Sequence, residues 1–405
     1  MDTLIQTSLL DALTKAALPR VLSAGLTAAT RLNLPVAIWR LPNESTTHLL
    51  ISLHPARKYE RIPLDEVAKG FVFAPFDLGN KRGIYLPADI LLSFKAKKWE
   101  VNIANKVPPQ LRKQWEEQFQ QQLENKEIAN YHSIDQLQPA EPDYRGFIAQ
   151  CIEAIRLKNF EKIVPAREVA YPLPQGFDSI TTFLKLSQAY PAAFASMVST
   201  PDTGTWMGAS PEILIAQENN TFSTTALAAT QPYVEGKELK DTAWTQKEIE
   251  EQAMVSRYII NCFKKIRLRD FTEKGPRTVK AGSLLHLKTT FEVDIEQTNF
   301  RELAAVMLDL LHPTSAVAGM PKHSAKAFLE THEQLDRQFY SGFLGPVQME
   351  GDSHLYVNLR CMQIDKASAH LYAGAGVTAD SIPEQEFLET EMKFQTMLNI
   401  LNLDS

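Results

Sequence analysis

Cysteine is scarce in this sequence, and its three copies, Cys151, Cys262 and Cys361, lie far apart in the chain. An odd number of distant cysteines argues against a disulfide framework and fits a reducing compartment. No spacing of His and Cys residues is typical of a zinc site either. We therefore expect neither a disulfide scaffold nor structural zinc.

Long basic runs and long apolar runs are also missing. The formal net charge is −6 and no block is rich in Lys or Arg, which argues against a general nucleic-acid-binding protein. The N-terminal region has an acid, Asp2, at its start and no apolar core long enough for a signal peptide or a spanning helix. We expect a soluble, cytoplasmic protein with no nucleic-acid or membrane partner. An acidic protein that binds an anion must build a local positive site, so individual Lys and Arg residues are informative.

A dinucleotide-binding fingerprint is absent as well. Gly374 and Gly376 frame a short glycine-rich element, but Ala379 stands where the third glycine would be, and the element precedes a loop. We therefore reject a Rossmann interpretation. The backbone N–H groups of this element remain candidates to bind a carboxylate.

The length and composition support large hydrophobic cores. The 405 residues, 44% of them hydrophobic, could form two or three domains, or one large domain with a smaller appendage. Predicted strands come in adjacent pairs rather than in β-α-β alternation, which favours antiparallel sheets covered by helices. We place a soft boundary near residues 139–142. It separates an N-terminal portion, residues 1–140, from a C-terminal region, residues 141–405, whose pattern is sharper.

The C-terminal end has the densest set of candidate functional residues. Residues 357–363 alternate as in a strand that contains Arg360, residues 365–367 fit a hairpin turn, and a return strand begins at residue 370. Pro383 then opens a helix on which Glu386, Glu389 and Lys393 share one face. Arg360 and Lys393 are candidates to hold an anionic substrate.

A second acidic pair, Glu248 and Glu251, stands three residues apart on a long helix predicted over residues 244–265. It matches the pair Glu386 and Glu389 in arrangement. Two facing helices of this kind can hold one Mg²⁺ with a carboxylate from each, while waters and a substrate oxygen complete six ligands. The alternative for each pair alone is a solvated helix face, where charges usually lie.

Two further residues are candidates for acid–base chemistry. Lys162 starts an otherwise apolar strand segment, where desolvation would lower its pKa and make it a usable base; the alternative is a strand-end lysine that reaches solvent. Glu212 stands in a tight turn before an apolar strand, where a raised pKa suits a general acid; the alternative is a turn-capping glutamate. His286 and His312 are isolated among apolar residues, as hydrogen-bonded core histidines often are.

Taken together and in order, ten stretches resemble the chorismate-utilising enzymes, which include isochorismate synthase, anthranilate synthase component I, aminodeoxychorismate synthase component I and salicylate synthase. The matching stretches are FEKIVPAR (160–167), MGASPEIL (207–214), TTALAAT (224–230), KEIEEQAMV (247–255), LLHLKTTFE (284–292), LHPTSAVAGMP (311–321), ETHEQLDRQFYSGFLGPV (330–347), VNLRCMQI (357–364), LYAGAG (371–376) and EFLETEMKFQTML (386–398). The resemblance implies an α/β fold of the α+β type, with two large stacked antiparallel sheets flanked by outer helices. It also implies an Mg²⁺-dependent enzyme that binds chorismate, a small dicarboxylate.

The resemblance also assigns roles to individual residues. Lys162 would take a proton from the water that attacks C2 of chorismate, and Glu212 would protonate the departing C4 hydroxyl. Glu251 and Glu389 would hold Mg²⁺, with Glu248 and Glu386 behind them. The implied chorismate-binding residues are Ala228, Thr230, His286, Thr314, Ala316, Arg360, Gly374, Gly376 and Lys393.

Among the members of the family, isochorismate synthase, an isomerase (hydroxymutase), is the expected match. A lysine stands at the place of Lys162 in the isochorismate and salicylate synthases, whereas Ala228 stands where aminodeoxychorismate synthase has its nucleophilic lysine. Three alternatives stay open: a salicylate synthase, an amino-transferring enzyme, and a chorismate-binding protein without catalysis. The sequence leaves open whether the product serves menaquinone or siderophore biosynthesis, and whether the protein is a monomer or a homodimer.

Three positions depart from the family pattern. Ala229 replaces a usual glycine, so its methyl group could crowd the substrate ring, and Gln252 replaces a frequent histidine beside the metal glutamate. Pro165 interrupts the strand of Lys162, and we expect it at a bulge or at an unpaired position. None of the three removes a proposed catalytic group.

Overall fold

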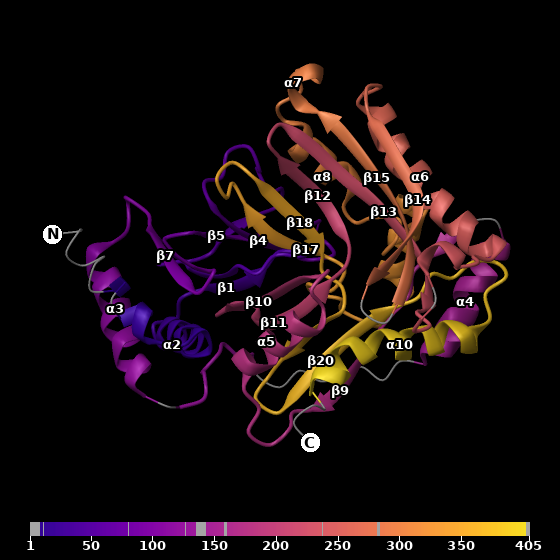
Figure 1. The fold of residues 1–405 in the computed structure, drawn as a ribbon. Coiled ribbons are helices and arrows are strands. Elements are labelled where there is room, and N and C mark those ends of the chain that lie inside the picture. The colour runs from indigo at the N-terminus through magenta and orange to yellow at the C-terminus, as the bar shows by residue number, and fades with distance from the viewer. Residues whose placement is uncertain are drawn as a thin grey trace.

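Two nine-stranded sheets form the frame of the protein (Figure 1). The computed structural model describes residues 9–401, except for residues 11, 80, 126, 135–142, 158–159, 237 and 282–283. Within these residues every strand pair of the two sheets is antiparallel. The predicted fold class, stacked antiparallel sheets with helices outside, is confirmed.

The strands of each sheet come from distant parts of the chain. In spatial order the first sheet contains β7 (Lys98–Ile103), β6 (Ile90–Lys95), β2 (Thr47–Ile51), β1 (Val36–Arg40), β10 (Phe194–Thr200), β11 (Gly204–Ser210), β19 (Cys361–Ile364), β20 (Ser368–Gly374) and β9 (Ala166–Pro172). The second sheet contains β14 (Thr272–Ala281), β15 (Leu284–Asp294), β13 (Thr221–Pro232), β12 (Ile213–Glu218), β18 (Ser353–Val357), β17 (Phe343–Val347), β4 (Gly70–Ala74), β5 (Gly83–Pro87) and β3 (Arg57–Tyr59). A short pair, β8 (Lys162–Ile163) and β16 (Gly319–Met320), stands apart.

Helices cover the outer faces of both sheets. They are α2 (Leu18–Arg31), α3 (Pro109–Glu124), α4 (Tyr144–Arg156), α5 (Ser179–Ala189), α6 (Gln246–Lys265), α7 (Ile295–Thr298), α8 (Leu303–Leu311), α9 (Lys322–His332) and α10 (Pro383–Leu401). One core joins the first sheet to α2, α5 and α10, and another joins the second sheet to α4, α6 and α8. A third core, rich in aromatic side chains such as Trp39, Phe73 and Trp206, fills the space between the sheets. None of the helices described is long and apolar enough to cross a bilayer.

The N-terminal strands belong to the same two sheets as the C-terminal strands. β1 pairs with β10 along its whole length, and β4 pairs with β17. Residues 36–103 therefore complete both sheets. The boundary expected near residues 139–142 lies outside the described residues.

Two of the places where the chain passes from one sheet to the other lie next to each other, and we call these two places the crossings. Ser210 ends β11 in the first sheet and Ile213 begins β12 in the second; in the opposite direction, β18 ends at Val357 and β19 begins at Cys361. The two crossings are held together by hydrogen bonds: the Val357 amide donates to the Glu212 carbonyl (3.0 Å), and the Ala209 amide donates to the Arg360 carbonyl (3.1 Å). Glu212 and Arg360 are thereby fixed side by side.

The expected single strand over residues 357–363 is wrong. Arg360 has a φ of +50°, in the left-handed region, which breaks the strand between β18 and β19. The predicted hairpin turn over residues 365–367 and the return strand are confirmed as the β19–β20 connection. Likewise, Pro165 separates β8 from β9 and pairs with no strand, as expected.

Candidate active site

A cavity of about 90 Å³ opens where the crossings, α6 and α10 converge. Most of the residues singled out in the sequence line it: Lys162, Glu212, Ala228, Thr230, Glu251, His286, Ala316, Arg360, Gly374, Gly376, Glu389 and Lys393. Three predicted residues, Glu248, Thr314 and Glu386, are not among its lining residues. Tyr340 and Tyr372 also line the cavity and were not predicted as site residues, although the DRQFYSG and LYAGAG stretches contain them.

Lys162 is buried, with 2% of its surface exposed, which contradicts the alternative of a solvent-reaching lysine. Its residue pairs with Met320 in the short β8–β16 ladder, which directs the side chain inward. The Lys162 Nζ donates to Glu251 Oε1 over 2.7 Å. Gly376 lies against this pair, because a Cβ there would stand 2.8 Å from Lys162 Cε. The absence of a Cβ at Gly376 therefore leaves room for the lysine beside the carboxylate.

Glu251 lies on α6 and faces the cavity as an anion. Burial disfavours its charge, but Lys162, with smaller contributions from Lys393 and Lys247, outweighs burial and lowers the pKa of Glu251. On α10, the Lys393 Nζ contacts Glu389 Oε1 (2.7 Å) and donates to the Gly374 carbonyl (2.7 Å). Each of the two cavity carboxylates on helices is thus paired with a lysine.

Glu212 is a cavity carboxyl that is held toward its neutral form. It is 5% exposed, and burial raises its pKa to about 7 although Lys162, Arg360 and Lys393 act in the opposite direction. A carboxyl with this pKa can give up or take a proton near neutral pH. Its position in the first crossing, beside Arg360, aims it into the cavity.

His286 presents an unpaired nitrogen at the cavity. Its Nδ1 lies 2.9 Å from the Ala229 carbonyl, so this nitrogen carries the proton, while the buried Nε2 has no hydrogen-bond partner among the described residues. Burial, reinforced by Arg360, lowers the pKa of His286 to about 4, which keeps the ring neutral. Buried polar atoms in native proteins are usually satisfied, so an orphaned Nε2 on a cavity wall is the mark of a ligand site.

Two of the residues that depart from the family pattern, Ala229 and Gln252, determine the backbone conformation of residues 228–230. Ala229 has a φ of +58° at a register shift in the β13–β15 pairing, a conformation that favours glycine. The buried Gln252 accepts a hydrogen bond from the Ala228 amide (3.1 Å) and donates to the Ala226 carbonyl (3.2 Å). Gln252, next to Glu251, therefore links strand β13 to α6 through hydrogen bonds. The sequence did not predict this role.

Two of the three other predicted residues, Glu248 and Glu386, have structural partners outside the cavity. Glu248 accepts hydrogen bonds from the backbone and hydroxyl of Thr245 and forms the capping box of α6. Glu386 is buried; its Oε1 accepts from Ser381 Oγ (2.6 Å) and contacts Lys247 Nζ (3.1 Å). Burial, followed by the neighbouring Glu389, raises the pKa of Glu386. The hydroxyl of Thr314 is buried and has no partner among the described residues.

The number of carboxylates in the cavity determines which kind of metal site it can form. Among the described residues, no group of three or more His, Cys, Asp or Glu side chains is close enough to hold a metal ion. Two carboxylates, Glu251 and Glu389, do face one cavity. Mg²⁺ in enzymes is commonly held by one or two carboxylates, with waters and substrate oxygens as the other ligands. The donor set fits Mg²⁺ that binds together with an anionic substrate.

Comparison with known proteins agrees with the site. Residues 80–402 match the family model described as "Chorismate binding enzyme". The isochorismate synthase DhbC of Bacillus subtilis is 30% identical over 74% of this chain and 77% of its own length, and EntC of Escherichia coli is 27% identical over 65% and 68%. The solved structure of MenF, the menaquinone-specific isochorismate synthase from Escherichia coli, superposes with a TM-score of 0.74 at 18% identity, over 94% of this chain and 91% of that chain.

Proposed function

The chain belongs to the chorismate-binding enzyme family, and we propose that it is an isochorismate synthase, an isomerase that converts chorismate reversibly into isochorismate. The observation that carries the proposal is the pairing of a buried lysine, Lys162, with a carboxyl of pKa about 7, Glu212, on one cavity. The reaction needs a base and an acid at the same time, and these two groups supply them.

The chemistry exchanges one hydroxyl group for another across the ring. Lys162, acting from its neutral form, takes a proton from a water molecule as the water oxygen bonds to C2 of chorismate. The ring double bonds shift, and the bond from C4 to its hydroxyl breaks. Glu212 gives its proton to the departing hydroxyl, which leaves as water. Atoms balance, and because one hydroxyl enters as another leaves, we expect a reaction near thermoneutral.

The remaining cavity residues hold the dianionic substrate. Arg360 and Lys393, which both line the cavity, supply positive charge for its carboxylates. The Ala375 amide already donates to the Pro165 carbonyl (3.2 Å), so it is not free to bind a carboxylate as the glycine-rich element was expected to do. The neutral His286 presents Nε2 as a hydrogen-bond acceptor for a substrate group.

We further propose Mg²⁺ as the cofactor. Glu251 and Glu389 would hold it, and it would supply positive charge that neutralises the ring carboxylate. Because both carboxylates are engaged by lysines, Lys162 and Lys393 must give up these contacts when the ion is bound. In our proposal Glu386 supports Glu389 from behind, while Glu248 acts through the first turn of α6.

The names of the relatives are the basis on which we propose a biological setting. MenF is described as menaquinone-specific, and EntC and DhbC are named isochorismate synthases. We propose that the isochorismate formed here enters menaquinone or siderophore biosynthesis in the cytoplasm. We also propose that residues 1–140 complete the catalytic unit rather than forming a separate one. A monomer or a homodimer stays a prediction.

A product assay tests the proposal. Purified protein is incubated with chorismate, with Mg²⁺ present or chelated, and the products are separated by chromatography. We expect isochorismate at a reversible equilibrium, and no product after chelation. Salicylate with pyruvate would identify a salicylate synthase, turnover only with ammonia would identify an amino-transferring enzyme, and binding without turnover would identify a non-catalytic protein.

A further inference from the structure

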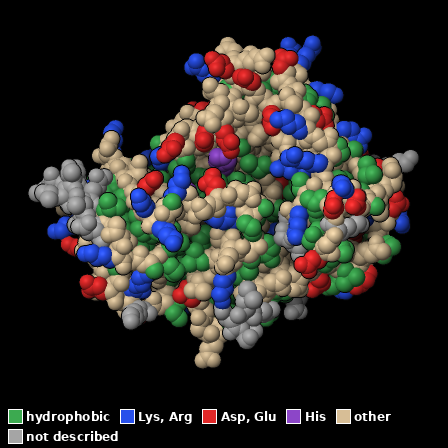
Figure 2. Space-filling model, in the orientation of Figure 1, with side chains coloured by type: hydrophobic (Ala, Val, Ile, Leu, Met, Phe, Trp, Pro, Cys, Tyr) green, Lys and Arg blue, Asp and Glu red, His purple; other side chains and the backbone are tan. Residues whose placement is uncertain are grey.

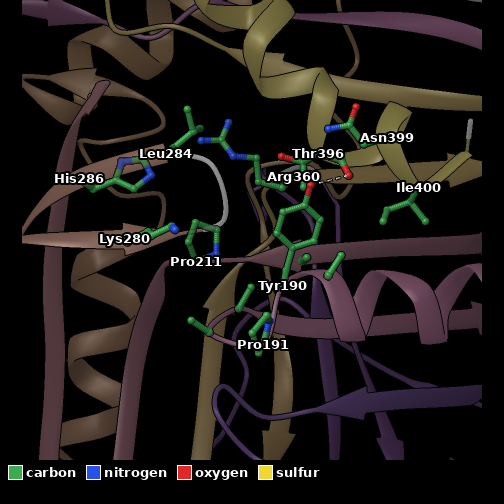
Figure 3. A pocket seen from close by; sticks show the side chains of 14 residues that line it. Tyr190, Pro191, Pro211, Lys280, Leu284, His286, Arg360, Thr396, Asn399 and Ile400 are labelled. Carbon is green, nitrogen blue, oxygen red and sulfur yellow. Dashed lines mark hydrogen bonds between the residues drawn. The ribbon is translucent and has the colours of Figure 1, made fainter. Parts of the chain in front are cut away.

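A second, larger cavity adjoins the catalytic one and has no role in the chemistry described above. This chamber, of about 550 Å³, lies between the C-terminal end of α5, the C-terminal half of α10 and the β14–β15 hairpin (Figure 3). Its rim includes Pro191, Ala192 and Asn399, which are exposed to solvent. The chamber is therefore open at its outer end.

The chamber and the catalytic cavity share part of their walls. Pro211, His286 and Arg360 line both. In Figure 3 the guanidinium of Arg360 reaches into the chamber, with His286 and Pro211 on the same side of it. A molecule that crosses the chamber therefore arrives at the residue that we expect to bind a substrate carboxylate.

The chamber suits an anion that carries a ring. Its charged lining residues are Lys280 and Arg360, and no Asp or Glu is among them. The remaining wall is largely apolar, with Tyr190, Leu284 and Ile400 as its larger members. The chain has a net charge of −6, but the charged residues that line this cavity are positive. The cavity therefore attracts a dicarboxylate locally.

Lys280 is held at the mouth of the chamber but not neutralised. Its Nζ lies 3.6 Å from the centre of the Tyr233 ring, and no ion pair with a carboxylate is recorded for it among the described residues. A lysine over an aromatic ring keeps its charge and stays available to an incoming anion. The opposite rim is firm, because Arg40 donates to the carbonyls of Tyr190 (2.8 Å) and Pro191 (2.9 Å).

The other side of the catalytic cavity is bridged by ion pairs. Lys247 on α6 contacts Glu386 on α10 over 3.1 Å, and the Lys162–Glu251 and Lys393–Glu389 pairs involve the same two helices. Entry between the two helices would require these contacts to open. The chamber offers a path on which no ion pair has to break.

We propose that the chamber is the entrance through which the dicarboxylate substrate reaches the catalytic cavity, and that Lys280 is the residue that attracts it there. The inference rests on the proposed function for the identity of the substrate. The route itself does not depend on the product, since consumption of chorismate reports passage whether isochorismate or salicylate is formed.

A covalent label that blocks the rim of the chamber tests whether the substrate enters through it. Because the three native cysteines are buried, Ala192→Cys provides a selective site for maleimides of increasing size. The unlabelled variant should keep wild-type kcat/KM, and the larger labels should lower it by about tenfold or more, since they obstruct encounter. Gln121→Cys on α3, exposed and remote from both cavities, is the matched control. Ala189→Cys, on the same rim, replaces Ala192→Cys if that variant folds poorly.

Wild-type kcat/KM in the labelled Ala192→Cys protein would overturn the route, and loss with the label at Gln121→Cys would do the same. If the wild-type protein consumes no chorismate at all, the proposed function fails. In that case the rate at which chorismate associates with labelled and unlabelled protein, followed by stopped-flow fluorescence, still decides whether the chamber is the entrance.

A charge substitution tests the role of Lys280. Lys280→Gln should lower kcat/KM by about two- to fivefold at low ionic strength, with kcat unchanged, and the difference should shrink as salt is added. Lys264→Gln makes the same change in net charge on the exposed end of α6 and should have no such effect. Equal values for the two variants, or a loss in kcat rather than in kcat/KM, would contradict attraction by Lys280.

Discussion

The Lys162 Nζ and the Glu251 Oε1 lie 2.7 Å apart, so the proposed base and a proposed metal ligand share one contact in the substrate-free protein. The lysine comes from the two-residue strand β8, and the glutamate comes from the second turn of α6. The side chains are 3% and 24% exposed, so solvent screens the pair only in part. The pair therefore contributes both to the stability of the fold and to the proposed reaction.

Removal of one partner should damage both stability and activity. Glu251→Gln leaves a buried ammonium without its counter-ion, and we expect a loss of about 2–3 kcal/mol in the free energy of unfolding. We expect at least about a hundredfold loss in kcat, because the position of the base and a metal ligand are both lost. Chemical denaturation and the product assay measure the two effects.

Glu250→Gln is the control for this prediction, since Glu250 is the neighbouring residue on α6 and is exposed. The double variant Lys162→Met/Glu251→Gln should recover part of the stability, because it removes both charges, but none of the activity. Wild-type stability and activity in Glu251→Gln would contradict the account of the pair.

The pH profile should show the ionisation of Glu212. The pKa of this carboxyl is raised to about 7, mainly by burial, and the protonated form is the acid. We therefore expect kcat/KM to fall as pH rises through about 7. Glu212→Gln should lower kcat by about 10²- to 10⁴-fold and abolish this limb of the profile. A wild-type profile that rises through this range would argue against Glu212 as the acid.

The same shift makes a prediction for stability. A carboxyl whose pKa is about 4.5 when unfolded and about 7 when folded favours the folded state in its protonated form. The wild-type protein should therefore lose up to about 3 kcal/mol from this group as pH rises from 4.5 to 7. Glu212→Gln should escape the loss and melt higher than the wild type above pH 7. Equal melting temperatures at alkaline pH would contradict the prediction.

Ala229 should be more stable as glycine. Its φ of +58° costs an L-residue about 1 kcal/mol, part of which is offset by the greater freedom of glycine in the unfolded chain. Ala229→Gly should raise the free energy of unfolding by up to about 1 kcal/mol without lowering activity. Ala226→Gly, in the regular part of the same strand, should lower it, so the two variants should shift denaturation midpoints in opposite directions. A destabilised Ala229→Gly would contradict the strain.

A charged histidine should stabilise the edge of the first sheet. Burial opposes protonation of His370, but Glu168, 2.6 Å from Nδ1, and Asp365, 3.2 Å from Nε2, outweigh it and raise its pKa above 6.5. The stabilisation is complete below pH 6.5 and is lost as pH rises through the higher folded pKa. His370→Gln should therefore be most destabilised relative to the wild type in mild acid. A difference that grows toward alkaline pH would exclude this explanation.

Sequence patterns correctly predicted the positions of site residues that lie in regular helices and strands. The shared face of Glu389 and Lys393 follows from helical spacing, and the helix is present. By contrast, β14 escaped notice because it is an edge strand with exposed polar residues and a Gly-Pro step, the features that keep edges from pairing further. On the face that Figure 2 shows, acidic and basic side chains are interspersed, so surface charge gave no guide to the site.

The site itself depends on contacts that no local pattern contains. Arg360 reaches the cavity because its left-handed backbone breaks the strand, and the period-two alternation of the sequence concealed this break. Lys162 packs against Gly376, which is more than two hundred residues away in the chain. Glu248 was grouped with Glu251 by spacing, although a capping box explains its position equally well. Family resemblance, rather than periodicity, brought the distant residues together.

Isotope incorporation from water tests the central claim most directly. The account requires that the hydroxyl at C2 of isochorismate comes from solvent, activated by Lys162, while the C4 hydroxyl departs with a proton from Glu212. In H₂¹⁸O, mass spectrometry of the first-formed isochorismate should show one ¹⁸O atom at C2, and Lys162→Ala should form no product. Isochorismate without ¹⁸O would mean that the hydroxyl moves within the substrate, and it would contradict the roles given to both residues.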